Sequence, residues 1–160
     1  MRVWGRFSWC GLPAISRRRA YPRRCVAVAV RTILFVCVEN SFRSIMSEAL
    51  FNAHAPPGWR AASAGVDAVG KAINPIANTL MEEIGLRVKK RHPEQVTPEM
   101  IQKAWRVVTF GCLDRCPPGA AGKSEDWPVP GSLGKTEAQL RGIRLDLENR
   151  VFDLIRRLPE

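Results

Sequence analysis

Hydrophobic runs and amphipathic segments alternate along the chain from residue 32 onward. The run TILFVC, residues 32–37, is continuous and rich in β-branched and aromatic side chains, which predicts a strand buried on both faces. Residues 44–54 then repeat apolar side chains on one helical face, and the sequence APPG ends that helix. Residues 59–65 and 105–110 predict a second and a third strand. The chain therefore opens as strand, loop and helix, the order of a parallel α/β unit.

Three further segments carry helix start and stop signals. Residues 74–85 begin with Asn-Pro and end with Gly, and residues 97–104 begin with Thr-Pro. From Thr136 to Leu158 apolar residues recur at spacings of three and four, and Gln139 completes a capping box with Thr136. Strands that alternate with helices predict an α/β sandwich around a mostly parallel sheet, with the ligand site at the carboxyl ends of the strands.

The net charge of +10 is concentrated at the N-terminus. Residues 1–32 hold eight arginines and no acidic residue, whereas residues 33–160 hold 17 basic and 15 acidic side chains. We therefore expect no nucleic-acid-binding or membrane-binding face on the domain. Residues 1–31 are predicted to be a disordered Arg-rich extension, either a targeting arm or a segment without function. Residues 32–158 are predicted to form one catalytic domain, which we expect to be a monomer.

The chain contains five cysteines: Cys10, Cys25, Cys37, Cys112 and Cys116. An odd number without a paired framework predicts a reducing compartment, hence a cytoplasmic protein, and catalytic rather than structural thiols. No segment approaches the ~20 apolar residues that span a bilayer. The spacing of the last two cysteines could supply half of a zinc site, but neither histidine of the chain has ligand spacing to them. We therefore expect neither a metal nor a cofactor.

The loop between the first strand and the first helix places a thiol, Cys37, and a guanidinium, Arg43, at its two ends. Such a loop directs backbone N–H groups and the positive helix terminus toward one point, which favours an oxyanion. The same field should hold Cys37 as a thiolate nucleophile, although a free cysteine can also be a buried core residue. The predicted oxyanion-binding residues are Val38, Glu39, Asn40, Ser41, Phe42, Arg43 and Ser44.

The segment VCVENSFRSIMSEAL, with SAG at 63–65 and VVTFGCLDRCP at 107–117, resembles the low-molecular-weight protein tyrosine phosphatase family, especially its arsenate reductase branch. The resemblance covers about residues 32–158. It implies a three-layer sandwich with a four-stranded parallel sheet flanked by helices. It also implies that Cys37 is the nucleophile and Arg43 the oxyanion clamp, while Asn40 shapes the loop and Ser44 supports the thiolate.

The same resemblance gives Cys112 and Cys116 a redox role. In thiol-coupled arsenate reductases Cys112 would attack the Cys37 arsenate adduct, and Cys116 would then resolve the Cys37–Cys112 disulfide. Thioredoxin or a similar dithiol would reduce the resulting Cys112–Cys116 disulfide. Alternatively, the pair is incidental in a phosphatase, or it protects Cys37 from oxidation through a reversible disulfide.

The sequence departs from the family pattern where a general acid is expected. Gly131 and Ser132 stand where the family carries an Asp-Pro pair, and such an acid is typically worth about 10²–10⁴-fold in rate. A substitute could be Asp126, Glu125 or Asp114, although each is more simply a solvated loop carboxylate. Three hypotheses remain: an arsenate reductase, which we favour, a tyrosine phosphatase, or a catalytically impaired protein that binds phosphate or arsenate.

Two charged features are expected to face solvent. Glu39 is an anion in an anion-binding loop, and its side chain must point outward if the loop is to bind an oxyanion. The run RVKKRH, residues 87–92, is predicted to be a solvated face that could also steer anions.

Overall fold

The structure, a computed structural model, describes residues 29–90 and 92–160. Its centre is a four-stranded, wholly parallel sheet with the strand order β2-β1-β3-β4. The strands are β1 (Arg31–Cys37), β2 (Trp59–Gly65), β3 (Arg106–Thr109) and β4 (Ser124–Asp126). The predicted α/β fold is therefore confirmed. Most of the predicted N-terminal extension lies outside the described residues, and its boundary at residue 31 stays a prediction.

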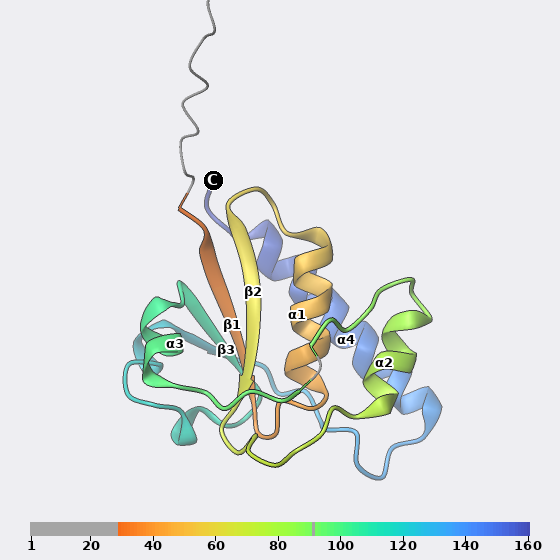
Figure 1. Ribbon diagram of the computed structural model, residues 1–160. Helices are drawn as coiled ribbons and strands as arrows, with labels where there is room; N and C mark the ends of the chain where they lie inside the picture. The colour runs from red at the N-terminus through yellow and green to blue at the C-terminus, as the bar shows by residue number, and fades with distance from the viewer. Residues whose placement is uncertain (1–28, 91) are drawn as a thin grey trace, which may run out of the picture.

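Helices cover both faces of the sheet, which makes a three-layer sandwich (Figure 1). α1, α2 and α4 pack on one face around Phe35 and Trp127, whereas α3 and two short 3₁₀ helices lie on the other face. The helices are α1 (Arg43–His54), α2 (Pro75–Glu82), α3 (Pro98–Lys103) and α4 (Glu137–Arg156), and the 3₁₀ helices are Leu113–Arg115 and Ala121–Lys123. No helix within these described residues is long and apolar enough to cross a membrane.

Three of the four α-helices begin with the side-chain caps that the sequence predicts. Asn74 caps α2, Thr97 caps α3, and Thr136 forms the predicted capping box with Gln139 at the start of α4. Each cap satisfies N–H groups that have no partner within the helix. α1 has no such cap, because its N-cap residue is Phe42 and it makes no side-chain hydrogen bond there.

All four strands run in the same direction, so their carboxyl ends meet at one edge of the sheet. Cys37 ends β1, Gly65 ends β2, and the loop that carries Cys112 and Cys116 follows β3. The lower end of Figure 1 shows this edge, where the loops between strands and helices gather. The fold therefore brings the predicted site segments to one end of the molecule.

Candidate functional site

Several carbonyl groups of the loop after β1 bind N–H groups outside the site. The carbonyls of Cys37 and Val38 accept hydrogen bonds from the N–H groups of Val66 and Asp67, at 3.0 and 2.8 Å. The carbonyl of Ser41 accepts one from Asn74 at 3.0 Å. With these carbonyls bound elsewhere and no side-chain cap on α1, the N–H groups of the first helical turn and of the loop remain for an anion, except that of Asn40, which donates to Cys37 Sγ.

Two residues allow this loop its conformation. Asn40 has φ 53°, the only positive φ among the non-glycine residues that the structure describes, and asparagine tolerates this left-handed region better than most residues. Gly65 lies directly beneath the loop, where a Cβ atom would come within 2.6 Å of the Val38 carbonyl oxygen and 2.7 Å of the Asn40 nitrogen. Only glycine at position 65 lets the loop pack this closely against the end of β2.

The sulfur of Cys37 is buried and faces hydrogen-bond donors. The backbone N–H of Asn40 donates to Cys37 Sγ at 3.2 Å, and Ser44 Oγ lies 3.0 Å from the same sulfur. Ser44 Oγ also accepts a hydrogen bond from Asn40 Nδ2 at 2.9 Å, so its own proton is available to the sulfur. This arrangement directs two hydrogen-bond donors at the sulfur atom.

Arg43 begins α1 and extends across the site. Its Nη1 donates to the carbonyls of Val129 and Phe110, at 2.9 and 3.3 Å, and its guanidinium lies over the Phe110 ring at 5.6 Å. These contacts fix the plane of the guanidinium. Among the described residues only Nη1 has acceptors, so Nε and Nη2 remain as a two-pronged donor for an oxyanion.

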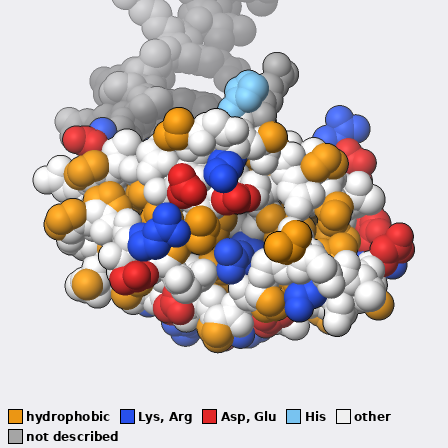
Figure 2. All heavy atoms as spheres, turned by 90° about the horizontal axis from the view of Figure 1, so that it is seen from below, with side chains coloured by type: hydrophobic (Ala, Val, Ile, Leu, Met, Phe, Trp, Pro, Cys, Tyr) orange, Lys and Arg blue, Asp and Glu red, His pale blue; other side chains and the backbone are white. Residues whose placement is uncertain are grey.

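An open pocket of about 280 Å³ lies above the Cys37 sulfur. Its lining residues are Cys37, Val38, Glu39, Ser41, Phe42, Arg43, Gly131, Ser132 and Leu133. The Glu39 side chain is half exposed and pairs with Lys71 at 3.3 Å, so its charge is neutralised at the rim. Figure 2, which views the molecule from this end, shows basic, acidic and apolar side chains mixed across the face. Anion binding here therefore depends on the local loop and Arg43 rather than on a broad basic surface.

The opposite wall of the pocket carries no carboxylic acid. Gly131 and Ser132 lie where the resemblance places the family's acid, and Asn74 Nδ2 donates to Ser132 Oγ at 3.0 Å. Asn74 thus links this wall to the Cys37 loop, whose Ser41 carbonyl it also binds.

The three carboxylates considered as substitutes for the missing acid lie outside this lining. Asp126 accepts hydrogen bonds from Thr109 and from the Gly111 N–H, and Glu125 pairs with Arg106 and Arg157. Asp114 belongs to the 3₁₀ helix after β3. None of the three lines the pocket, so a proton donor would have to come from elsewhere.

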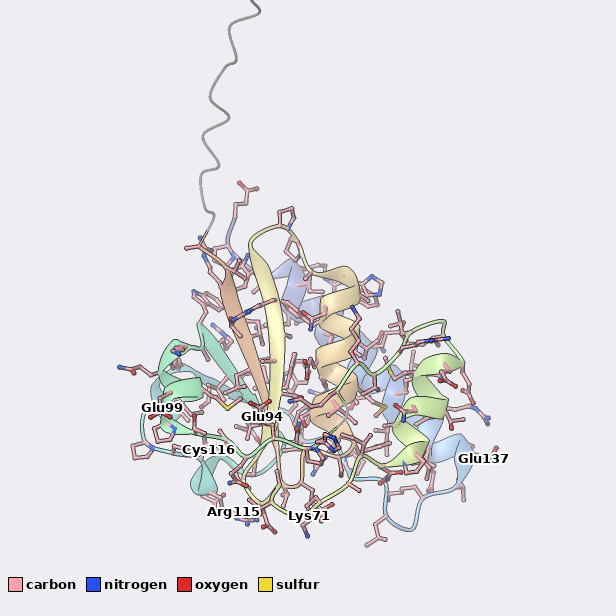
Figure 3. The ribbon with its side chains drawn as sticks, in the orientation of Figure 1. Lys71, Glu94, Glu99, Arg115, Cys116 and Glu137 are labelled. Atoms are coloured by element: carbon pink, nitrogen blue, oxygen red, sulfur yellow. The ribbon has the colours of Figure 1, made fainter. Side chains whose placement is uncertain are left out.

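Cys112 and Cys116 follow β3 and lie apart from the lining of this pocket. Cys112 is fully buried, and its thiol donates to the carbonyl of Val36, the residue before Cys37, at 3.3 Å. Cys116 is partly buried on the α3 side of the sheet, as Figure 3 shows. All three of these thiols are free. A disulfide between Cys37 and Cys112 requires the loop after β3 to move, because the two side chains pack in different clusters on the two sides of the sheet.

The two downstream thiols differ in acidity. A hydrogen bond from the Cys116 thiol lowers the pKa of Cys112 to about 7 against the opposing effect of burial, and the charge of Arg43 contributes in the same direction. The pKa of Cys116 is raised, first by its hydrogen bond to Cys112 and then by burial. Cys112 is therefore the more acidic thiol of the pair and Cys116 the less acidic one.

The predicted site residues fall into three groups. Those that line the pocket are named above, Asn40 and Ser44 are buried beneath it, and Cys112 and Cys116 lie beside the end of β1.

Sequence reasoning missed Asn74, whose cap motif predicted a helix start and nothing more. It also missed Lys90, which belongs to a run expected to face solvent but whose side chain is only 13% exposed. Within residues 29–90 and 92–160 no group of three or more His, Cys, Asp and Glu side chains is placed to hold a metal ion.

Comparisons with known proteins agree with this geometry. Residues 32–115 match the model of the family described as low molecular weight phosphotyrosine protein phosphatase. An arsenate reductase from Staphylococcus aureus is 30% identical over 122 residues, which cover 74% of this chain and 91% of that protein.

Solved structures show the same likeness. A tyrosine phosphatase from Erwinia amylovora superposes with a TM-score of 0.73 at 25% identity, covering 82% of this chain and 95% of that one. A thioredoxin-dependent arsenate reductase from Corynebacterium glutamicum superposes with a TM-score of 0.68 at 28% identity, covering 82% of this chain and 63% of that one. The family match spans the Cys37 loop, β2, β3 and Cys112. This chain therefore belongs to the low molecular weight phosphotyrosine protein phosphatase family.

Proposed function

We propose that the protein is an arsenate reductase that reduces arsenate to arsenite with the thiols of Cys37, Cys112 and Cys116. The observation that carries this proposal is the second thiol pair beside the end of β1, with Cys112 as its more acidic member. A phosphatase of this fold needs only the first thiol. The arsenate reductase from Staphylococcus aureus and the thioredoxin-dependent enzyme from Corynebacterium glutamicum support the assignment.

In the first step the Cys37 thiolate attacks arsenic. Arsenate would bind against the N–H groups of the loop and the Nε and Nη2 groups of Arg43, with Cys37 Sγ beneath its central atom. A sulfur–arsenic bond forms, and one arsenate oxygen leaves as water after taking up protons. The adduct still contains pentavalent arsenic, so arsenic is not reduced in this step.

In the second step Cys112 attacks the sulfur of Cys37. A sulfur–sulfur bond forms, and the electron pair of the sulfur–arsenic bond passes to arsenic, which leaves as trivalent arsenite. Cys116 then attacks Cys112, which forms a Cys112–Cys116 disulfide and returns Cys37 as a thiolate. Two thiols are thus oxidised for each arsenate reduced. The low pKa of Cys112 supports this order of attack.

An external dithiol must reduce the final disulfide, and thioredoxin or a similar carrier in the cytoplasm fits that requirement. Cys116 is the more exposed of the two sulfur positions and is where a carrier would approach. The glycines and prolines after Cys116, from Pro117 to Gly122, suit a segment that must move to deliver the pair to Cys37. That the protein acts as a monomer stays a prediction.

The direct test is arsenite production from arsenate with thioredoxin, thioredoxin reductase and NADPH. We expect sustained turnover by the full-length protein and weak hydrolysis of phosphotyrosine by the same preparation. Efficient phosphotyrosine hydrolysis without arsenite would instead establish a phosphatase, and binding of phosphate without either reaction would establish an impaired homologue.

The phosphatase alternative is favoured by the complete oxyanion loop and opposed by the pocket wall without an acid. Gly131→Asp is expected to raise hydrolysis of phenyl phosphate, a substrate with a poor leaving group, by about tenfold or more, since general acids contribute about 10²–10⁴-fold. A Cβ atom at position 131 meets no atom within 4 Å, so the change fits the wall. The measurement is kcat for phenyl phosphate and for p-nitrophenyl phosphate, whose good leaving group needs no acid.

Gly131→Asn is the matched control, because it adds a side chain of the same size that cannot donate a carboxyl proton. We expect it to leave both rates near those of the natural protein. An equal gain with Asn, or a gain on both substrates alike, would contradict the idea that this wall lacks only its proton donor.

A further inference from the structure

The orientation of Ser44 depends on the side-chain amide of Asn40, which is held on both sides. Asn40 Nδ2 donates to Ser44 Oγ and to Ser63 Oγ, each at 2.9 Å, and Asn40 Oδ1 accepts from the N–H of Glu94 at 2.8 Å. Asn40, Ser44 and Ser63 are all fully buried. Because Ser44 Oγ accepts from Asn40, its own proton must go to a different acceptor. Cys37 Sγ lies 3.0 Å from Ser44 Oγ and can accept it.

One ammonium group contacts both residues that hold Asn40. Lys90 Nζ donates to the carbonyl of Ser63 and to Glu94 Oε2, the latter at 3.1 Å, and it lies 3.9 Å from Glu48 Oε2. Lys90 thus contacts α1 at Glu48, β2 at Ser63 and the segment before α3 at Glu94, the last of which is labelled in Figure 3. It therefore joins three segments that are distant in sequence and that all meet beneath the Cys37 loop.

Glu48 sets the direction of the hydrogen-bond chain. Ser63 Oγ donates to Glu48 Oε2, which leaves the Ser63 oxygen to accept from Asn40. This direction is fixed while Glu48 is ionised, because a carboxylate can only accept. Burial raises the pKa of Glu48 and Glu94 raises it further, whereas the Ser63 hydroxyl and the Lys90 ammonium lower it. Among the described residues, Lys90 is the cation whose charge opposes the protonation of this partly buried carboxylate.

We propose that Lys90 is a positioning residue for Cys37. Its charge keeps Glu48 ionised, which keeps Ser63 donating to Glu48, Asn40 donating to Ser63 and Ser44, and Ser44 donating to the Cys37 sulfur. Without Lys90, the charge of Glu94 acts on Glu48 without the opposing ammonium, and Glu48 takes up a proton that it can donate back to Ser63. The inference rests on the proposed function only in taking Cys37 as the nucleophile.

The test is the rate of alkylation of Cys37 by iodoacetamide as a function of pH, followed by mass spectrometry of the Cys37 peptide in the full-length protein. Lys90→Gln retains a donor for the Ser63 carbonyl but removes the charge. We expect alkylation at pH 7 to slow about tenfold and its pH profile to move upward by about one unit. Lys90→Arg, which restores the charge, should stay within about threefold of the natural protein. The matched control is Lys89→Gln, a neighbouring exposed lysine, which should leave the profile unchanged.

A second variant separates charge from folding. Glu48→Gln combined with Lys90→Gln removes both charges and retains an acceptor for Ser63, so its profile should return to within about threefold of the natural one. If Lys90→Gln alone fails to fold, which circular dichroism will show, the double variant still tests the proposal. An unshifted profile in folded Lys90→Gln, or a double variant that stays tenfold slow, would overturn the proposal. Alkylation uses no arsenate, so neither result depends on which reaction the enzyme catalyses.

Discussion

Cys37→Ser is expected to abolish both arsenite formation and phosphotyrosine hydrolysis, with a loss of at least about 1,000-fold in kcat. The substituted hydroxyl is not ionised at neutral pH, and the hydrogen bonds from Asn40 and Ser44 that stabilise a thiolate have no anion to stabilise. The loop itself needs no thiol to bind an oxyanion, because its donors are N–H groups and Arg43. The variant should therefore still bind inorganic phosphate, which isothermal titration can measure.

Cys25→Ser is the control for this substitution, since Cys25 lies in the N-terminal segment and is expected to take no part in either reaction. Arsenite formation that survives in Cys37→Ser would assign the attack on arsenic to another thiol. Loss of phosphate binding together with activity would instead mean that the change had altered the loop.

Cys116→Ser is expected to limit the protein to at most about one arsenite per chain. Cys112 can still attack the Cys37 adduct and release arsenite, but no thiol follows to resolve the Cys37–Cys112 disulfide. The variant should accumulate this disulfide, which mass spectrometry of non-reduced peptides identifies. Phosphotyrosine hydrolysis, which requires Cys37 alone, should change by less than about twofold before arsenate is added.

Cys112→Ser provides the comparison, because it removes the thiol that reduces the adduct and should release no arsenite at all. Repeated turnover by Cys116→Ser with thioredoxin would remove Cys116 from the relay. If the two substitutions also impaired phosphotyrosine hydrolysis, Cys112 and Cys116 would be part of a phosphatase site rather than a redox-active thiol pair.

The regular elements of the fold were predictable because their signals are local. β1 is a continuous apolar run, and the caps at Asn74, Thr97 and Thr136 mark helix starts within a few residues. β4 was missed, because its three residues are polar and it exists through pairing with β3 at the edge of the sheet. No local sequence pattern predicts the pairing of β4 with β3.

The predicted site followed the same rule. Cys37 and Arg43 lie at the two ends of one loop, and their spacing predicted an oxyanion site in combination with the apolar strand before them and the helix after them. The residues that orient Asn40 come from β2 and from the segment before α3. SAG at 63–65 contributes to the family resemblance, but no local pattern predicts that Ser63 or Glu94 contacts Asn40. Lys90 lies in a run of charges that resembles a solvated face, and only the tertiary fold buries it beside Glu48.

The position of the family's general acid was predicted only in part. The missing general acid was predicted from Gly131, and in the structure Gly131 and Ser132 form a pocket wall without a carboxylate. Glu39, the carboxylate in the lining, belongs to the Cys37 loop and pairs with Lys71. What the sequence left open was whether Asp126 or Glu125 substitutes. Both are bound to partners elsewhere, which three-dimensional contacts alone could establish.

The most direct test of the thiol relay uses the reduced full-length protein, excess arsenate and no reductant. Arsenite is measured per chain, and the disulfides are mapped by mass spectrometry after the remaining thiols are alkylated. The relay predicts about one arsenite per chain, a Cys112–Cys116 disulfide and an alkylated Cys37. No arsenite, with all three thiols alkylated while phosphotyrosine is hydrolysed, would contradict it.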